Sequence, residues 1–257
     1  TLGGLIVWRG AAWWVIRGET VAPLDKNFKL IGGGPFGSVG ETLSWIIGAV
    51  VCAAIIGLIL NGRWQRRKFK FPLRPVWAES LLGGLGCLAT IGAVLIVNAY
   101  PWAPKVAERW AQDNNVTVPD GGLVIGHGFA IPVLIALGIG IAMTFLATRT
   151  KFGRYVYATG GNPEAADLAG INTKRITLAM FSLMGALAAV SASISSARLD
   201  SATNSLGQFD ELYVIAAAVI GGTSLAGGIG TIYGAMLGAL VMQSLQSGMT
   251  LLNLESA

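Results

Sequence analysis

Five uninterrupted apolar blocks, none containing Asp, Glu, Lys or Arg, constrain what this sequence can fold into more than any other feature. They cover Thr42–Leu60, Ser80–Asn98, Phe129–Ala147, Ile176–Ala197 and Thr231–Leu252. Each is close to the roughly 20 residues that a helix needs to cross the hydrocarbon core of a bilayer. Because only 12% of the residues are charged and 53% are hydrophobic, the composition also differs from that of soluble domains. We therefore expect an all-α fold, a polytopic transmembrane helical bundle.

Two weaker apolar stretches add to this pattern. Leu2–Val15 is interrupted by Arg9, and Leu212–Val219 runs directly into glycines. With them, the sequence predicts about six to seven membrane segments. The chain begins within an apolar stretch and ends abruptly at Ala257. We accordingly expect residues 1–257 to form a single transmembrane domain that is incomplete at both ends.

The distribution of basic residues predicts the orientation of the spans, because short loops rich in Lys and Arg stay on the cytoplasmic side. The segments that follow Leu60 and Ala147 are both strongly basic, so we expect both to lie inside. The intervening segments, Glu19–Glu41, Tyr100–Gly126 and Arg198–Glu211, are balanced or acidic and are expected outside. Membrane orientation thus explains the net charge of +5, and we expect no nucleic-acid partner.

Several classes of function are disfavoured by what the sequence lacks. No Gly-Lys pair occurs, so the usual Walker A loop for ATP is missing. His127 is the sole histidine, which excludes multi-histidine metal sites, and we expect no metal, no cofactor and no catalytic residue in this chain. Gly222–Ala226 resembles a serine nucleophile elbow, but Ala226 replaces the final glycine. The charge-free blocks lack the proton relay common in secondary transporters, so the energy source should lie elsewhere.

The basic segment after Ala147 contains the signals of a short helix. Asn162 is a good N-cap, Pro163 suits the first helical position, Glu164 suits the first turn and Gly170 suits the C-terminus. Flanked by the pair Gly160–Gly161, such a helix could move as a unit and dock in a groove of a cytoplasmic partner. The residues alone leave an equal alternative, a capped helix that merely covers the ends of spans.

Glycines also break the apolar region at Gly221–Gly230. Irregular backbone at membrane depth survives only where protein or a water-filled cavity satisfies it, so a discontinuous helix near a translocation path is plausible. Three glycines at four-residue spacing follow and predict a face for close helix packing or for a subunit interface. These glycines are Gly230, Gly234 and Gly238.

A serine-rich and amide-rich stretch joins two spans at the outer side. Hydroxyls and amides suit a neutral polyhydroxyl solute, although composition alone favours an ordinary polar loop. We assign to the translocation path the polar residues of this stretch, of the glycine-rich break and of one span end. They are Asn98, Ser193, Thr203, Asn204, Gln208, Thr223 and Ser224.

At this point the sequence resembles a known family. The stretches that carry the resemblance are Phe152–Asn172, Ala197–Gly207, Glu211–Leu245 and Thr1–Gly10. They are similar to the monosaccharide permeases of bacterial ABC importers, the ribose, xylose and galactose group. The middle of the chain, including FPLRPVWAE at Phe71–Glu79, looks most like the D-xylose permeases.

The resemblance implies a multi-pass subunit of the bacterial inner membrane that imports a monosaccharide, most specifically D-xylose. It implies a second permease copy in a homodimer, a periplasmic sugar-binding protein, and a cytoplasmic ABC ATPase that holds the ATP and Mg. It also makes residues 148–175 a cytoplasmic coupling loop. The residues it assigns to coupling are Gly160, Gly161, Asn162, Pro163, Glu164, Ala165, Ala166, Leu168 and Gly170.

Three alternatives remain. A secondary transporter or channel is disfavoured by the charge-free blocks and the elaborate inner helix. A membrane-embedded enzyme is disfavoured by the missing histidine, cysteine and carboxylate constellations. A purely structural membrane subunit would show no solute flux.

Overall fold

The computed structural model describes residues 2–34, 37–72, 75–113 and 125–252. Within these ranges the chain is helical, and its only β pairing consists of isolated bridges, so the expected all-α fold is confirmed. The chain divides into two compact units, which are described separately. One unit is residues 26–133, and the other combines residues 1–25 with residues 134–257.

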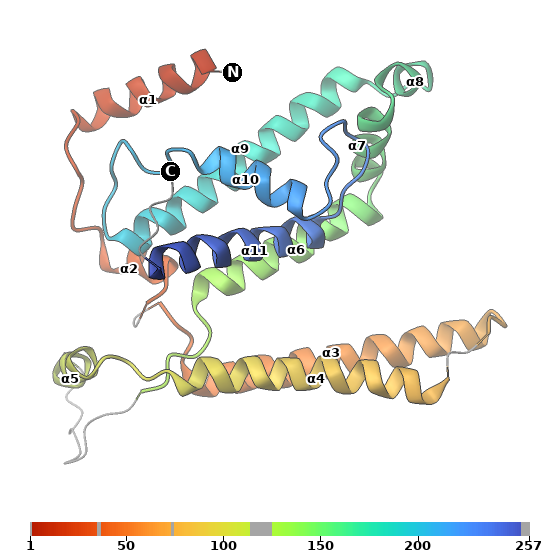
Figure 1. The fold of residues 1–257 in the computed structure, drawn as a ribbon, viewed down its shortest axis with the longest axis horizontal. Helices are drawn as coiled ribbons and strands as arrows, with labels where there is room; N and C mark the ends of the chain where they lie inside the picture. The colour runs from red at the N-terminus through yellow and green to blue at the C-terminus, as the bar shows by residue number, and fades with distance from the viewer. Residues whose placement is uncertain (1, 35–36, 73–74, 114–124, 253–257) are drawn as a thin grey trace. The chain divides into compact units, whose positions relative to one another are not determined.

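The first unit is dominated by one long helical hairpin. It comprises α2 (Lys26–Lys29), the 3-10 turn η1 (Leu30–Gly32), α3 (Gly40–Lys68), α4 (Val76–Ala99) and α5 (Pro104–Asp113). Helices α3 and α4 run side by side along most of their length (Figure 1). They contain the predicted blocks Thr42–Leu60 and Ser80–Asn98 and extend beyond both at each end.

Glycine on one helix faces a branched side chain on the other along the α3–α4 interface. Gly48 of α3 lies against Val94 of α4, which is 1% exposed. Further along, Ile59 of α3 lies beside Gly83 of α4. Side chains, rather than backbone, therefore fill the space between these two helices.

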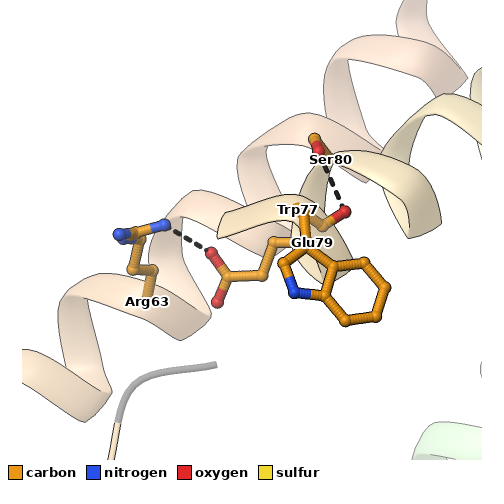
Figure 2. A network of polar contacts seen from close by, with 4 residues as sticks. All are labelled: Arg63, Trp77, Glu79 and Ser80. Atoms are coloured by element: carbon orange, nitrogen blue, oxygen red, sulfur yellow. Dashed lines mark hydrogen bonds and ion pairs between the residues drawn. The ribbon is translucent and has the colours of Figure 1, made fainter. Parts of the chain in front are cut away.

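Polar contacts fasten both ends of this hairpin. At the basic end, Arg63 forms a 2.8 Å ion pair with Glu79, near a turn bond from the Ser80 hydroxyl to the carbonyl of Trp77 (Figure 2). At the other end, the fully buried Ser44 donates to the Gly40 carbonyl at 2.8 Å and accepts from the Phe129 N–H at 2.9 Å. A buried hydroxyl with both partners made is stabilising rather than costly.

The second unit carries the remaining helices. They are α1 (Leu2–Ile16), nearly all of α6 (Ile131–Arg149), α7 (Lys151–Gly161), α8 (Pro163–Leu168), α9 (Thr173–Leu199), α10 (Asp210–Ile220) and α11 (Ile232–Leu251). Helix α10 packs on α11, and α7 packs on both α8 and α9 (Figure 1). The segment after α1 pairs with the loop after α9, through a bridge between Val21 and Ala202.

The described helices include four that are long and apolar enough to cross a membrane, namely α3, α4, α6 and α9. By length and composition, the described residues thus contain fewer full spans than the six to seven membrane segments expected. Helix α10 has 11 residues, too few for a full crossing, and the described part of α1 has 15 residues. Helix α11 has 20 residues, but Gln243, Ser244 and Gln246 lower its apolar character.

Candidate functional site

Helix α8 is built almost entirely by local capping. The Asn162 side chain accepts a 3.0 Å hydrogen bond from the N–H of Ala165, and Pro163 occupies the first turn. At the other end Gly170 has φ +83°, and the N–H of Ile171 donates to the Ala166 carbonyl at 3.0 Å. This is a Schellman arrangement, which needs a left-handed residue where glycine stands. The predicted helix is present with the predicted ends.

One face of α8 is anchored and the rest is open. Ala166 is 4% exposed and packs inward, whereas Leu168 is 91% exposed. Glu164 and Asp167 are exposed as well. A leucine this exposed on the same open side as two carboxylates is an unusual surface for a short loop helix, because nothing in the described chain covers it.

A helix that the sequence did not reveal leads into α8. Residues expected as part of a loop form α7, which begins when the Thr150 hydroxyl accepts from the N–H of Gly153 at 3.3 Å. Gly160 and Gly161, interpreted as flanking a mobile helix, are the last two residues of α7. The sequence signal that could have indicated this helix is Thr150 directly before its first residue, because threonine is a favoured N-cap residue.

The glycine-rich break is a loop between α10 and α11, as the sequence predicted. It is closed by internal bonds, including one from the N–H of Ser224 to the Ile229 carbonyl at 2.9 Å. Gly227 and Gly228 have φ of +94° and +74°, a left-handed backbone that other residues rarely adopt. The loop is therefore an ordered element that depends on glycine.

This loop is docked against α7. A side chain at Gly160 would collide with the backbone of Gly228, 2.7 Å from its nitrogen. Beside this contact, the Tyr157 hydroxyl donates to the Gly230 carbonyl at 2.9 Å. The helix that carries α8 and the loop that breaks the α10–α11 region are thus in direct backbone contact.

Part of the predicted small-residue face lies between α10 and α11. Gly234 and Gly238 are buried, and side chains on them would meet the backbone of Gly221 and Ala217 respectively. Gly230 lies in the loop, beside Thr223. Two of the three glycines therefore let two helix backbones approach closely.

The residues assigned to the translocation path are not gathered in one place. Thr223 and Ser224 line a cavity of about 490 Å³ whose other walls are mainly apolar side chains of α6, α7 and α9. A separate cavity of about 370 Å³ lies between α1, the segment that follows it, and the loop after α9. Its lining includes Thr203, Asn204 and Gln208, together with Arg9 and Glu19.

The last two path residues lie elsewhere. The Ser193 hydroxyl donates to the Ala189 carbonyl of its own helix at 2.9 Å. Asn98 belongs to the other unit, at the end of α4, and its buried amide has no hydrogen-bond partner among the described residues. Their assignment to a path stays a prediction.

No group of three His, Cys, Asp or Glu side chains within the described ranges could hold a metal ion. The cysteines, Cys52 and Cys87, are free thiols on α3 and α4. The surfaces that the described chain offers are therefore exposed faces, backbone contacts and cavities.

Comparison with known proteins places this sequence in a family. Residues 39–256 match the family described as "Branched-chain amino acid transport system / permease component". The xylose transport system permease protein XylH of Haemophilus influenzae is 34% identical over 259 residues, covering 100% of this chain and 60% of the relative. The Escherichia coli protein of the same name is 34% identical over 258 residues, covering 100% of this chain and 58% of the relative.

A second group of relatives covers half of the chain. The ribose import permease protein RbsC of Escherichia coli is 44% identical over 129 residues, which is 50% of this chain and 40% of that protein. The chain spans about 60% of the length of the xylose-type relatives. No solved structure matches. Since the family match extends over most of the sequence, the chain belongs to the transport-system permease family that residues 39–256 identify.

Proposed function

We propose that this protein is the membrane-spanning permease subunit of an ATP-driven ABC importer that moves a monosaccharide, D-xylose in the first instance, across the bacterial inner membrane. In this proposal a separate cytoplasmic ATPase hydrolyses ATP with Mg, and a periplasmic sugar-binding protein delivers the sugar. Two permease copies form the pathway. The support is the family match, together with relatives that are named as xylose and ribose permeases.

The observation that carries the proposal is the exposed face of α8. A six-residue helix capped at both ends, with Leu168 91% exposed beside Glu164, fits a groove on a partner. The basic residues of α7 and of the α9 start favour the cytoplasmic side for this helix, where an ATPase would be. The prediction that residues 148–175 couple the two subunits follows from this placement.

The docked glycine loop extends the proposed mechanism. When the ATPase closes, it would displace α8 and with it the end of α7. Because Gly160 lies against Gly228 and Tyr157 holds Gly230, that displacement would be passed to the loop between α10 and α11. Coupling of this kind needs contacts that differ between the two states of the transporter, and a backbone-to-backbone contact is suited to two discrete positions.

Uptake in proteoliposomes tests this function. The permease is reconstituted with its ATPase and binding protein, and ATP-dependent uptake of labelled xylose is compared between wild type and the α8 variants Leu168→Ser and Glu164→Arg. We expect uptake to need ATP and to fall at least about tenfold in Leu168→Ser, because an apolar anchor in a protein interface contributes on the order of 1.4 kcal/mol or more.

The matched control is Leu199→Ser, a leucine that is 60% exposed at the far end of α9. This variant should transport like wild type. Uptake without ATP or partners would instead identify a secondary transporter or channel. Conversely, ATP-dependent uptake that both α8 variants leave unchanged would keep the importer and remove α8 from the coupling site. Competition with unlabelled ribose and galactose then ranks the sugars.

A further inference from the structure

A groove between α7 and α9 has two chemically different ends. Its first part is a cavity of about 510 Å³ whose lining includes Lys174, Thr173 and Thr159. The next part, about 330 Å³, shares Thr159 and Phe181 with the first. That part in turn shares Met180 and Met184 with the 490 Å³ cavity. The three spaces adjoin in series, from a polar end to an apolar one.

The polar end combines a cation with an unsatisfied hydroxyl. Lys174 has no ion-pair partner anywhere in the described chain, and its side chain is exposed at the start of α9. The Thr159 hydroxyl is buried and has no hydrogen-bond partner among the described residues. A buried hydroxyl without a partner is unfavourable, so a group that supplied an acceptor there would be favoured.

Thr159 differs from several other helical threonines of the described chain. Thr144 and Thr177 donate to the carbonyl four residues earlier at 2.7 and 2.9 Å, the usual solution for a threonine within a helix. Thr159 lies in α7 and makes no such bond. Its hydroxyl is therefore an unpaired polar group in the wall of the groove, one that a ligand acceptor reaches only when the side chain turns toward the polar end.

The remainder of the groove is apolar and open. Leu178, Phe181 and Met184 of α9 are 69%, 60% and 63% exposed, and they follow Lys174 along one face of the helix at spacings of three and four residues. A free phosphate or a nucleotide would leave this face uncovered. A hydrocarbon chain attached to an anionic headgroup would fill both parts at once.

We propose that the α7–α9 groove is a binding site for an anionic phospholipid. The headgroup phosphate accepts hydrogen bonds from the Lys174 ammonium and the Thr159 hydroxyl, and an acyl chain lies along Phe181 and Met184. The basic segments place this end of α9 on the cytoplasmic side, and the cytoplasmic leaflet carries the anionic lipids. The assignment holds for this chain as a membrane protein and does not rest on the identity of the transported solute.

Native mass spectrometry of the whole purified chain in detergent micelles tests the site. Phosphatidylglycerol and phosphatidylcholine with identical acyl chains are added in turn, so that only the headgroup differs. We expect retention of phosphatidylglycerol by wild type and about fivefold lower occupancy in Lys174→Gln, since a lysine near an anionic lipid surface contributes about 1 kcal/mol. The control Lys151→Gln removes the same charge from α7 at a residue that does not line the groove and should retain lipid like wild type.

Thermal melting in the same micelles separates binding from folding. Without added lipid, Thr159→Val should melt at or above the wild-type temperature, because a methyl group replaces an unpaired hydroxyl. Phosphatidylglycerol should raise the melting temperature of wild type and raise that of Thr159→Val less. Equal retention of the two lipids, an equal loss in Lys151→Gln, undiminished retention in Lys174→Gln, or stabilisation by inorganic phosphate alone would each overturn the proposal.

Discussion

The two helical hairpins of this protein, α3–α4 and α10–α11, achieve close packing in different ways. Between α3 and α4, each glycine faces a side chain of the opposite helix, as Gly48 faces Val94. Between α10 and α11, Gly238 faces the backbone of Ala217 in α10, and Gly234 faces that of Gly221, the residue after α10. A side chain can change rotamer when a neighbour grows, but a helix backbone cannot move without disturbing its own hydrogen bonds.

The loops of the two hairpins differ in the same sense. The α3–α4 hairpin is closed by a half-buried side-chain ion pair, Arg63–Glu79. The α10–α11 hairpin is closed by a glycine loop whose backbone lies on α7. The side chains that hold the first hairpin together can thus readjust, whereas main-chain contacts fix the second hairpin at both its interface and its loop.

The largest expected effect is that of Gly238→Ala. Its new methyl group would overlap the Ala217 carbonyl and the Gly221 nitrogen, so we expect a loss of about 3 kcal/mol in the free energy of unfolding. Equilibrium unfolding in detergent measures it. The control is Gly138→Ala in α6, where no atom lies within 4 Å of the added group and helix propensity favours alanine by about 0.5–1 kcal/mol. Equal stability of the two variants would show that the backbone facing Gly238 does not limit the space there.

Gly48→Ala should be milder, a loss of about 1 kcal/mol. The added carbon would lie 2.8 Å from a Val94 methyl group, and alanine's helix propensity offsets part of the strain. Val94→Ala alone should also lose stability because Val94 is buried, but the double variant should lose less than the sum of the singles. Strict additivity of the two losses would show that Val94 is not what limits the space at Gly48.

Tyr157→Phe removes the hydroxyl that holds the Gly230 carbonyl, and we expect a loss of about 1 kcal/mol. Hydrogen exchange should rise mainly in the loop 221–231, because that loop loses its contact with α7. Tyr155→Phe is the matched control, since the Tyr155 hydroxyl makes no hydrogen bond within the described chain. Faster exchange throughout α7 instead would mean that the tyrosine stabilises the helix rather than the loop.

The smallest effect should come from Glu79→Gln, about 0.5 kcal/mol, because Arg63 is 35% exposed and lets solvent screen the pair, although Glu79 is only 11% exposed. The loss should shrink in 1 M salt, where screening is stronger. Glu108→Gln in α5, an exposed glutamate with no ion pair among the described residues, should change nothing measurable. A loss above about 2 kcal/mol would make the ion pair a fixed element and the first hairpin less adjustable than proposed.

The helices differ in how well the sequence predicted them. The long helices were predictable because unbroken apolar blocks of about 20 residues have few alternatives. Helix α8 was predictable because its determinants, Asn162, Pro163 and Gly170, are local in sequence. The short helices α5 and α7 were not predicted. Ala107 and Ala111 of α5 are fully buried, but alanines contribute little to a hydrophobic periodicity that would predict a helix.

The candidate site was predictable only in its parts. The sequence identified both the glycine loop and the inner helix, but not that Gly160 and Gly228 touch, because a contact between residues so far apart in the chain leaves no local signal. The path residues failed to converge for a similar reason. Hydroxyl and amide side chains were selected by chemical type, and type does not determine which cavity a residue lines.

The capping of α8 has an entropic consequence for a partner that docks on Leu168. A helix of six residues is too short to persist by itself in water, since nucleating a turn is unfavourable. Here Asn162 and Gly170 close both ends, and Ala166 ties the middle to the protein. Ordering a residue's backbone costs about 1–2 kcal/mol, and this loss is already met during folding. A docking partner would therefore meet a helix that is already ordered. Free energy that would be spent on ordering a flexible loop would then remain available for binding and for displacing the helix.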